Sequence, residues 1–304
     1  MKCLVTGGAG FIGSHLVDRL IQDGHEIIVI DNLSTGSTDN INPKCKFYGY
    51  DCQDYLKIYY LFDGVDVVFH TAAIARTMLC IEQPKLCHDS NINGTFSVLM
   101  AAKNYGVKAF VYSSSCGVYG HQDEFPIKEY AKLDILTPYA LSKYVGEEYC
   151  RLFSNLYRLP NMILRYANVY GTKRQSREGA YPNVLSAFVK QKELNGYLEI
   201  TGSGQQTRDF IHVYDVVESN IIAMNLILNE GVITGFPINI GTGVDTSMNE
   251  IAKYFNCPIK YIDPRPAEPQ HLFLDIEMAE NLMGWSPKIN LDKGMSIFLK
   301  EIYG

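Results

Sequence analysis

Tyr139 and Lys143 stand four residues apart in a stretch with helical periodicity, so both side chains face the same side of the predicted helix. A free tyrosine phenol, with a pKa of about 10, is a poor base at neutral pH. A nearby ammonium group favours the phenolate and moves its pKa toward neutrality. A serine hydroxyl such as that of Ser115 can hydrogen-bond the same substrate oxygen and help to shuttle its proton. Together these residue types predict proton abstraction from a substrate hydroxyl group.

The position of this pair carries more information than its spacing. The chain has 21 tyrosines, so about one YxxxK match is expected by chance. The pair follows a strand-like run at 108–113 that leads into Ser113, Ser114 and Ser115. Ligands bind at the carboxyl ends of strands in an open parallel sheet, so the serines and the pair are expected to share one site. A polar loop and a half-buried helix aromatic are the alternative interpretations.

Three glycines, Gly7, Gly10 and Gly13, follow a strand-like run at 2–6 and open a helix-like stretch at 11–23. One glycine permits the tight turn, one lets the backbone approach a pyrophosphate, and one lets helix and strand pack closely. The helix N-terminus then presents free N–H groups and a positive dipole end to the phosphates. The GxxGxxG spacing therefore predicts a dinucleotide site, and a plain strand–helix turn is the alternative.

Asp31 lies eighteen residues after Gly13, where a second buried strand at 26–30 ends. A carboxylate there can accept hydrogen bonds from both hydroxyls of the adenosine ribose. Its negative charge repels a 2′-phosphate, and Asn32 rather than an arginine follows it. The cofactor is therefore expected to be NAD rather than NADP, and its cationic nicotinamide would favour a phenolate nearby. A strand-ending turn residue is the simpler interpretation of Asp31 taken alone.

Buried strands alternate with helices along the first 172 residues. The expected strands are 2–6, 26–30, 46–50, 66–70, 108–113 and 161–165, and the expected helices are 11–23, 90–105 and 137–156. This alternation predicts an α/β fold with a doubly wound parallel sheet of the Rossmann type. Residues 1–172 are expected to form the NAD-binding domain.

After residue 172 the pattern changes with the polar run TKRQSREGA. The segments beyond it are a helix-like stretch at 181–195, strand-like runs at 198–200 and 236–240, and a proline-rich segment at 263–269. Residues 173–304 are expected to form mainly a smaller mixed lobe that closes over the end of the sheet. The chain is expected to cross back to the sheet from this lobe.

The composition excludes several classes of protein. The 304 residues carry a formal net charge of −6, and the lack of a basic stripe argues against a nucleic-acid partner. No apolar run reaches the ~18 residues of a membrane span, and the N-terminal MKCLVTGG lacks a signal-peptide pattern. The eight cysteines form no C-x-x-C pair and do not cluster with histidines at zinc spacing. We expect a cytoplasmic protein with free thiols and no metal.

Ten motifs follow one another from end to end of the chain. They are TGGAGFIGSHL (6–16), DNLSTG (31–36), VFHTAA (68–73), NINGT (91–95), SSSCGVYG (113–120), PYALSK (138–143), LRYANVYG (164–171), QTRDFIHVYDV (206–216), NIGTG (239–243) and RPAEP (265–269). Their number and order resemble the extended short-chain dehydrogenases/reductases. Within that group the chain is similar to the nucleotide-sugar epimerases of the UDP-glucose 4-epimerase type.

The resemblance implies roles for the matching positions. It implies a catalytic set of Ser115, Tyr139 and Lys143. It implies an NAD site lined by Gly7, Gly10, Phe11, Ile12, Gly13, Asp31, Asn32, Ser34, Gly36, Asp51, Cys52, Ala72, Tyr139, Lys143 and Tyr166. For the nucleotide sugar it implies Ser115, Asn168, Arg208, Arg265 and Glu268. Arginine suits this role because its planar fork pairs with phosphate oxygens, although surface salt bridges are the alternative for Arg208 and Arg265.

The implied reaction inverts C-4 of a nucleotide-diphosphate sugar of the UDP-glucose or UDP-galactose type. Tyr139 takes the proton of the 4-hydroxyl while a hydride passes to NAD, and the transient 4-keto sugar turns over before the hydride returns. NAD is regenerated in every cycle and is expected to stay bound. Related dehydratases and decarboxylases place an acid after the residue that matches Ser115, whereas Cys116 and Gly117 stand here. Cys116 is either a packing residue or, less in keeping with the motif, a general acid.

The substrate sugar stays open at this point. Leu272 matches the position that helps such epimerases to accept or reject N-acetylated sugars, and Arg76 could meet a uronate carboxylate or lie exposed in a loop. UDP-glucuronate or UDP-N-acetylhexosamine 4-epimerases, and other short-chain dehydrogenases that modify nucleotide sugars, are the alternatives. A non-catalytic NAD-sensing regulator is a further one, but such proteins typically lose the tyrosine or the lysine. The resemblance also implies a homodimer in which the helices at 90–105 and 137–156 form a four-helix bundle.

Overall fold

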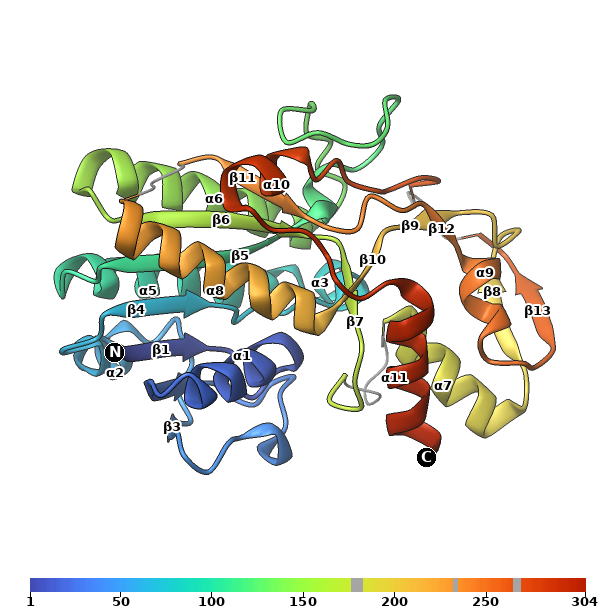
Figure 1. Ribbon diagram of the computed structural model, residues 1–304, viewed down its shortest axis with the longest axis horizontal. Coiled ribbons are helices and arrows are strands. Elements are labelled where there is room, and N and C mark those ends of the chain that lie inside the picture. Colours follow the sequence, from blue (N-terminus) through green and yellow to red (C-terminus); the bar gives the residue numbers. More distant parts are fainter. Residues whose placement is uncertain (176–182, 232–234, 265–268) are drawn as a thin grey trace.

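A seven-stranded parallel sheet forms the centre of the structure, with helices on both of its faces (Figure 1). The computed structural model describes residues 1–175, 183–231, 235–264 and 269–304. The strands lie in the order β11-β6-β5-β4-β1-β2-β3. Their bounds are β1 Lys2–Thr6, β2 Glu26–Ile30, β3 Lys46–Tyr48, β4 Val67–His70, β5 Ala109–Ser115, β6 Asn161–Tyr166 and β11 Pro237–Ile240. The predicted doubly wound parallel α/β fold is confirmed.

The sheet is covered by two pairs of long helices. On one face α1 packs against α8, and on the other face α5 packs against α6. Their bounds are α1 Phe11–Gln22, α5 Gly94–Asn104, α6 Pro138–Tyr157 and α8 Val213–Glu230. Shorter elements join them: α2 Tyr55–Ile58, α3 Thr77–Glu82, α4 Pro84–Cys87, a π-helical segment His88–Asn93, and single 3-10 turns at Thr38–Asn40, Tyr59–Phe62 and Cys116–Val118.

The two helical layers follow from the apolar character of both faces of each strand. Side chains of a strand alternate between the faces of a sheet. In β1, Cys3 and Val5 belong to the core under α1 and α8, whereas Leu4 between them belongs to the core under α5 and α6. A strand buried on both sides is typical of a parallel sheet with helices on each face.

The remaining elements form a lobe beside the carboxyl ends of the sheet strands (Figure 1). They are β7 Asn168–Tyr170, α7 Val184–Asn195, β8 Leu198–Thr201, β9 Thr207–Arg208, β10 Phe210–His212, β12 Thr246–Ser247, α9 Met248–Lys253, β13 Ile259–Ile262 and α11 Leu291–Tyr303. The exception is α10 Glu277–Met283, which packs on β11 and α8 beside the central sheet. Three two-stranded pairs, β7 with β10, β8 with β13 and β9 with β12, connect this part of the chain. A separate apolar core that includes Phe188, Phe255 and Phe298 holds α7, α9 and α11 together.

The chain returns to the central sheet more than once after residue 172. Helix α8 packs on β5 and β6, and β11 pairs in parallel with β6 at the edge of the sheet. The strand-like run at 236–240 therefore belongs to the sheet, and α8 is an element that the sequence pattern did not single out. A domain boundary at residue 172 stays a prediction, because the central sheet contains elements from both before and after this residue.

Helix α6 carries the YxxxK pair and has clear end signals. The Thr137 side chain accepts a hydrogen bond from the backbone N–H of Ala140, and Pro138 occupies the first turn. These are favoured residues at a helix start, because the first turn leaves N–H groups without helical partners. Arg158 ends the helix in the left-handed conformation. Tyr139 thus lies in the first turn of α6, close to the carboxyl ends of the strands.

The helices of the described residues are either too short or too polar to cross a lipid bilayer.

Candidate active site

The glycine turn between β1 and α1 is tightly packed. Gly7 has a φ of 72°, a conformation that favours glycine. A Cβ atom on Gly7 would lie 2.7 Å from the backbone nitrogen of Ala72, and one on Gly13 would lie 2.2 Å from the Gly7 carbonyl oxygen. The backbone N–H of Gly10 donates to the same oxygen at 3.0 Å. Only glycine fits at Gly7 and Gly13, so the structure agrees with the spacing argument.

The start of α1 has the features of a phosphate-binding helix N-terminus. Gly10 occupies the cap position, and no side chain of the described residues caps the helix. The residues that open the helix are Phe11 and Ile12, whose N–H groups have no partner within the helix itself. Uncapped N–H groups at a helix N-terminus beside a glycine turn suit the negative charge of a pyrophosphate. The residues present therefore fit the phosphates of NAD.

Asp31 is buried at the carboxyl end of β2. Its Oδ2 accepts a hydrogen bond from the Ala9 N–H at 3.0 Å, and its Oδ1 accepts one from the Leu33 N–H at 2.8 Å. Burial raises the pKa of this carboxyl group, and the two N–H groups oppose that rise. The carboxylate thus connects the glycine turn with the loop after β2, where the adenosine end of a dinucleotide would lie.

The other residues implied for the adenosine end gather on neighbouring loops. Asn32 donates from Nδ2 to Asp51 Oδ2 at 2.8 Å, and its Oδ1 accepts from the Ser34 N–H at 3.0 Å. Cys52 is buried next to Asp51. Gly36 lies against Ala9 of the glycine turn, since a Cβ at Gly36 would come within 3.0 Å of the Ala9 carbonyl group. The structure therefore brings this set together around Asp31.

Lys143 is held at the carboxyl end of β5. Its Nζ donates to the carbonyl oxygen of Ser113 at 2.7 Å, and it lies over the Tyr112 ring at 5.3 Å from the centroid. The side chain is buried, and this burial lowers the pKa of Lys143 to about 8. With its pKa lowered this far, a buried lysine can release its proton near neutral pH.

Tyr139 lies next to Ser115. Burial raises the pKa of the Tyr139 phenol above its ordinary value, and a hydrogen bond with the Ser115 side chain offsets only part of this rise. The Ser115 Oγ also accepts a hydrogen bond from the Gly117 N–H at 3.1 Å. A Cβ on Gly117 would lie 3.3 Å from this Oγ and 3.8 Å from the Tyr139 ring. Gly117 therefore keeps room at the hydroxyl pair, a role that the sequence reasoning missed.

Tyr166 supports the site from β6. It is paired in register with Ser115 on β5, and its hydroxyl group lies 3.1 Å from Ser113 Oγ. It also donates to Asn220 Oδ1 of α8 at 3.0 Å. Burial raises the pKa of the Tyr166 phenol to about 12, so it remains neutral and keeps its donor hydrogen.

Of the substrate residues, Asn168 and Arg208 are described, whereas Arg265 and Glu268 lie outside the described residues. Asn168 starts β7, and its N–H donates to the Asp209 carbonyl oxygen at 2.9 Å, which places it beside Arg208. The Arg208 Nη1 donates to the Pro269 carbonyl oxygen at 2.9 Å. The guanidinium group is thus fixed at the residue that directly follows the undescribed RPAE segment.

Three features thus lie at the carboxyl ends of neighbouring strands. They are the glycine turn after β1, the acidic Asp31 after β2, and Ser115 of β5 with Tyr139 and Lys143 of α6. The family model for the NAD dependent epimerase/dehydratase family matches residues 3–241. The chain belongs to this family.

Relatives and solved structures agree with that membership. A putative UDP-glucose 4-epimerase of Methanocaldococcus jannaschii is 43% identical over 300 residues, covering 96% of this chain and 95% of the relative. The crystal structure of UDP-glucose 4-epimerase from Thermotoga maritima with UDP-glucose has a TM-score of 0.92 at 35% identity and covers 99% of this chain and 98% of its own. The Thermus thermophilus UDP-glucose 4-epimerase complex with NAD has a TM-score of 0.90 at 30% identity, covering 100% and 99%.

Within this epimerase family fold, the position after Ser115 is apolar. Cys116 is buried in the main core, and burial raises the pKa of its thiol to about 12. A thiol with so high a pKa is a poor proton donor at neutral pH. The location favours packing over the general-acid interpretation of Cys116.

The two residues considered for sugar choice lie in different surroundings. Leu272 is buried in the main core, and its carbonyl oxygen accepts from the Asp209 N–H at 3.0 Å. Arg76 precedes α3 as its cap residue and is half-buried. Among the described residues, no group of three or more His, Cys, Asp or Glu side chains could hold a metal ion.

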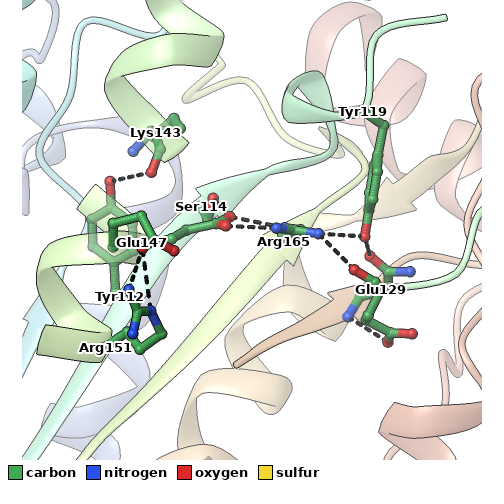
Figure 2. Close-up of polar contacts among 10 residues, drawn as sticks. Tyr112, Ser114, Tyr119, Glu129, Lys143, Glu147, Arg151 and Arg165 are labelled. Carbon is green, nitrogen blue, oxygen red and sulfur yellow. Dashed lines mark hydrogen bonds and ion pairs between the residues drawn. The ribbon is translucent and has the colours of Figure 1, made fainter. Parts of the chain in front are cut away.

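Sequence reasoning also missed a buried network behind the site. Figure 2 shows Ser114, Glu147 and Arg165 joined by hydrogen bonds, with Lys143 one turn away on the same helix. One signal was available, because Glu147 follows Lys143 by four residues and therefore shares its helix face.

Proposed function

We propose that the chain is an NAD-dependent 4-epimerase of nucleotide-diphosphate sugars, of the UDP-glucose and UDP-galactose type. The observation that carries this proposal is at the carboxyl end of β5, where Tyr139 lies next to Ser115 and the buried Lys143 ammonium group binds the Ser113 carbonyl oxygen. The glycine turn and Asp31 lie at the ends of neighbouring strands of the same sheet, which is where a dinucleotide binds in such folds.

Each residue of the proposed catalytic set has one task. Tyr139 accepts the proton of the sugar 4-hydroxyl, and Ser115 hydrogen-bonds the same oxygen and relays the proton. The Lys143 ammonium group stabilises the phenolate by its charge. NAD, when bound, would supply the acceptor for the C-4 hydride and the source from which that hydride returns. Proton and hydride leave together, so the hydroxyl carbon becomes a ketone, and both return to give the inverted alcohol.

The nucleotide-binding residues keep the rest of the substrate in place. The NAD pyrophosphate would be held by the start of α1 and by Gly7, Gly10 and Gly13, and the NAD ribose would be held by Asp31. Arg208 and Asn168 are proposed to hold the diphosphate and nucleoside of the sugar substrate, with Arg265 and Glu268 of the same motif set. A substrate that is anchored through its nucleotide leaves the 4-keto sugar free to turn over and present its opposite face.

Turnover of a substrate panel tests the proposed function. Purified protein is mixed separately with UDP-galactose, UDP-N-acetylgalactosamine and UDP-glucuronate, and interconversion is followed by NMR. We expect conversion of UDP-galactose to UDP-glucose. Conversion of no nucleotide sugar in the presence of bound NAD would contradict the proposal and favour the NAD-sensing regulator.

The choice of sugar is tested at Arg76. If its guanidinium group meets a uronate carboxylate, Arg76→Ala raises KM for UDP-glucuronate and leaves KM for UDP-galactose unchanged. Equal kinetics of variant and wild type with UDP-glucuronate would exclude that role.

A homodimer through α5 and α6 is part of the proposal. The two helices pack together and expose apolar side chains that include Phe96, Leu152 and Leu156, the last at 67%. A contiguous exposed apolar face marks an interface. Leu156→Glu should shift the sedimentation coefficient to that of a monomer, whereas Leu194→Glu on α7, where Leu194 is 72% exposed, should not. A monomeric wild type would exclude the dimer.

A cytoplasmic location is also proposed. All eight cysteines are free in the structure, and six of them are buried. Unpaired thiols are typical of proteins in a reducing compartment. Cell fractionation tests this location, and recovery outside the cytoplasm would contradict it.

A further inference from the structure

A buried ion pair lies one helical turn beyond Lys143. Glu147 on α6 and Arg165 on β6 are each 3% exposed. The guanidinium group binds the carboxylate at two points, Nε to Oε1 at 2.8 Å and Nη2 to Oε2 at 2.6 Å (Figure 2). The Ser114 hydroxyl donates to the same carboxylate at 2.5 Å. Side chains from β5 and β6 therefore meet at one carboxylate of α6.

The sheet register explains how they meet. Ser114 on β5 is paired with Arg165 on β6, so both side chains leave the same face of the sheet. Glu147 reaches them from α6, which covers that face. Tyr139, Lys143 and Glu147 follow one another at intervals of four residues and line one side of the helix. Fixing the Glu147 carboxylate thus fixes the rotation and height of the helix face that carries the proposed catalytic pair.

The opposite end of the guanidinium group is tied to the chain that follows Ser115. Arg165 Nη1 donates to the Tyr119 hydroxyl at 2.9 Å and to the Glu129 carbonyl oxygen at 3.1 Å (Figure 2). The Tyr119 hydroxyl in turn donates to Asn239 Oδ1 of β11 at 2.6 Å. One 3-10 turn, Cys116–Val118, separates Tyr119 from Ser115. A single buried cation therefore contacts both the helix of Tyr139 and the segment that leaves Ser115.

We propose that the Glu147–Arg165 pair, with Ser114, is a positioning device that sets the distance between Tyr139 and Ser115. The inference rests on the proposed function. A buried ion pair loses solvation, and apolar residues of similar volume would often hold a fold as well. What the pair adds is direction, because a bidentate guanidinium–carboxylate contact has fixed geometry. A displacement of 1 Å at reacting groups can reduce the rate about 100-fold.

The first test replaces both partners at once, as Glu147→Met with Arg165→Met. Loss of one partner alone leaves an unpaired buried charge and destabilises the fold, whereas an apolar pair often does not. Melting temperature, NAD bound per chain, kcat and KM are measured. We expect a folded, NAD-containing variant with kcat lowered about 100-fold and KM unchanged. A folded variant with the kcat of the wild type would overturn the proposal.

A milder variant serves if the double variant does not fold. Ser114→Ala removes one contact to the carboxylate and leaves the ion pair. Its matched control is Ser219→Ala, a buried serine of α8 whose hydroxyl donates to the Val216 carbonyl oxygen in the same helix. We expect Ser114→Ala to lower kcat at unchanged KM. Ser114→Thr keeps the hydroxyl group and should have the kcat of the wild type. Equal kcat values for the two alanine variants would overturn the positioning role.

A crystal structure of the double variant, or of Ser114→Ala if the double variant does not fold, gives a readout other than activity. We expect the Tyr139 hydroxyl to move relative to Ser115 Oγ by about 1 Å, the displacement that accounts for the slower rate. Unchanged positions would overturn the inference even if kcat fell. Failure of the proposed function is seen separately, in a wild-type protein that converts no nucleotide sugar.

Discussion

The Lys143 ammonium group donates a hydrogen bond of 2.7 Å to the main-chain carbonyl oxygen of Ser113. This oxygen belongs to β5, two residues before Ser115, so the strand backbone fixes the lysine relative to the serine. The contact holds the ammonium group without neutralising it, since a carbonyl group carries no charge. In the proposed mechanism this charge acts on the phenol of Tyr139, which lies on the preceding turn of α6.

Removal of the phenol hydroxyl should stop the chemistry and spare binding. For Tyr139→Phe we expect kcat to fall by about 100-fold to 10,000-fold, the usual range for a general base, with KM nearly unchanged. Initial rates with UDP-galactose measure both constants. Tyr144→Phe on the same helix is the control and should keep wild-type rates. A Tyr139→Phe variant with more than half of the wild-type kcat would exclude the role.

The glycine cradle should not accept even one methyl group at Gly13. Because a Cβ there would lie 2.2 Å from the Gly7 carbonyl oxygen, Gly13→Ala must displace the turn. We expect loss of bound NAD and a lower melting temperature, measured by nucleotide release on denaturation and by calorimetry. Gly49→Ala is the control, since its Cβ would meet only the Phe47 ring at 3.7 Å. Full NAD content in Gly13→Ala would contradict the cradle.

The negative charge of Asp31, and not only the size of its side chain, should strengthen NAD binding. Its charged oxygens hold the Ala9 and Leu33 N–H groups and are proposed to bind the ribose. Hydrogen bonds to charged groups contribute about 1.5–3 kcal/mol, so Asp31→Asn should weaken NAD binding about tenfold to a hundredfold. Equilibrium dialysis measures the Kd. The exposed Asp123→Asn variant should leave it unchanged, and equal Kd values for both variants would refute the role.

The pH dependence of stability should reveal Lys143 in nucleotide-free protein. Burial lowers its pKa from 10.5 to about 8, so between these values the unfolded chain binds the proton that the folded chain has released. The free energy of unfolding therefore rises with pH across this window relative to Lys143→Met. Urea unfolding at several pH values measures the difference. For the control Lys44→Met, at an exposed position, the free energy of unfolding should depend on pH as in the wild type. The same pH dependence for Lys143→Met and wild type would contradict the lowered pKa.

The sequence determined the local features that depend on neighbours along the chain. Glycine at three spaced positions predicted the turn that the structure contains, because only glycine fits where a Cβ would strike the Gly7 carbonyl oxygen. The four-residue interval between Tyr139 and Lys143 placed both on one face of α6. The alternation of apolar strands and helices was sufficient for the parallel sheet. Each of these depends on local backbone geometry and side-chain periodicity.

Only the tertiary structure decided which distant residues meet. Ser114 and Arg165 are neighbours because β5 pairs with β6 in one particular register, and a shift of one residue would send Arg165 to the other face. Likewise, α8 and β11 return to the main sheet from a part of the chain that reads as a separate lobe. Strand order, register and helix docking arise from burying complementary apolar surfaces, and these are properties of the folded chain as a whole. The sequence therefore indicated the proposed reacting groups, whereas tertiary packing alone brought together the network proposed to align them.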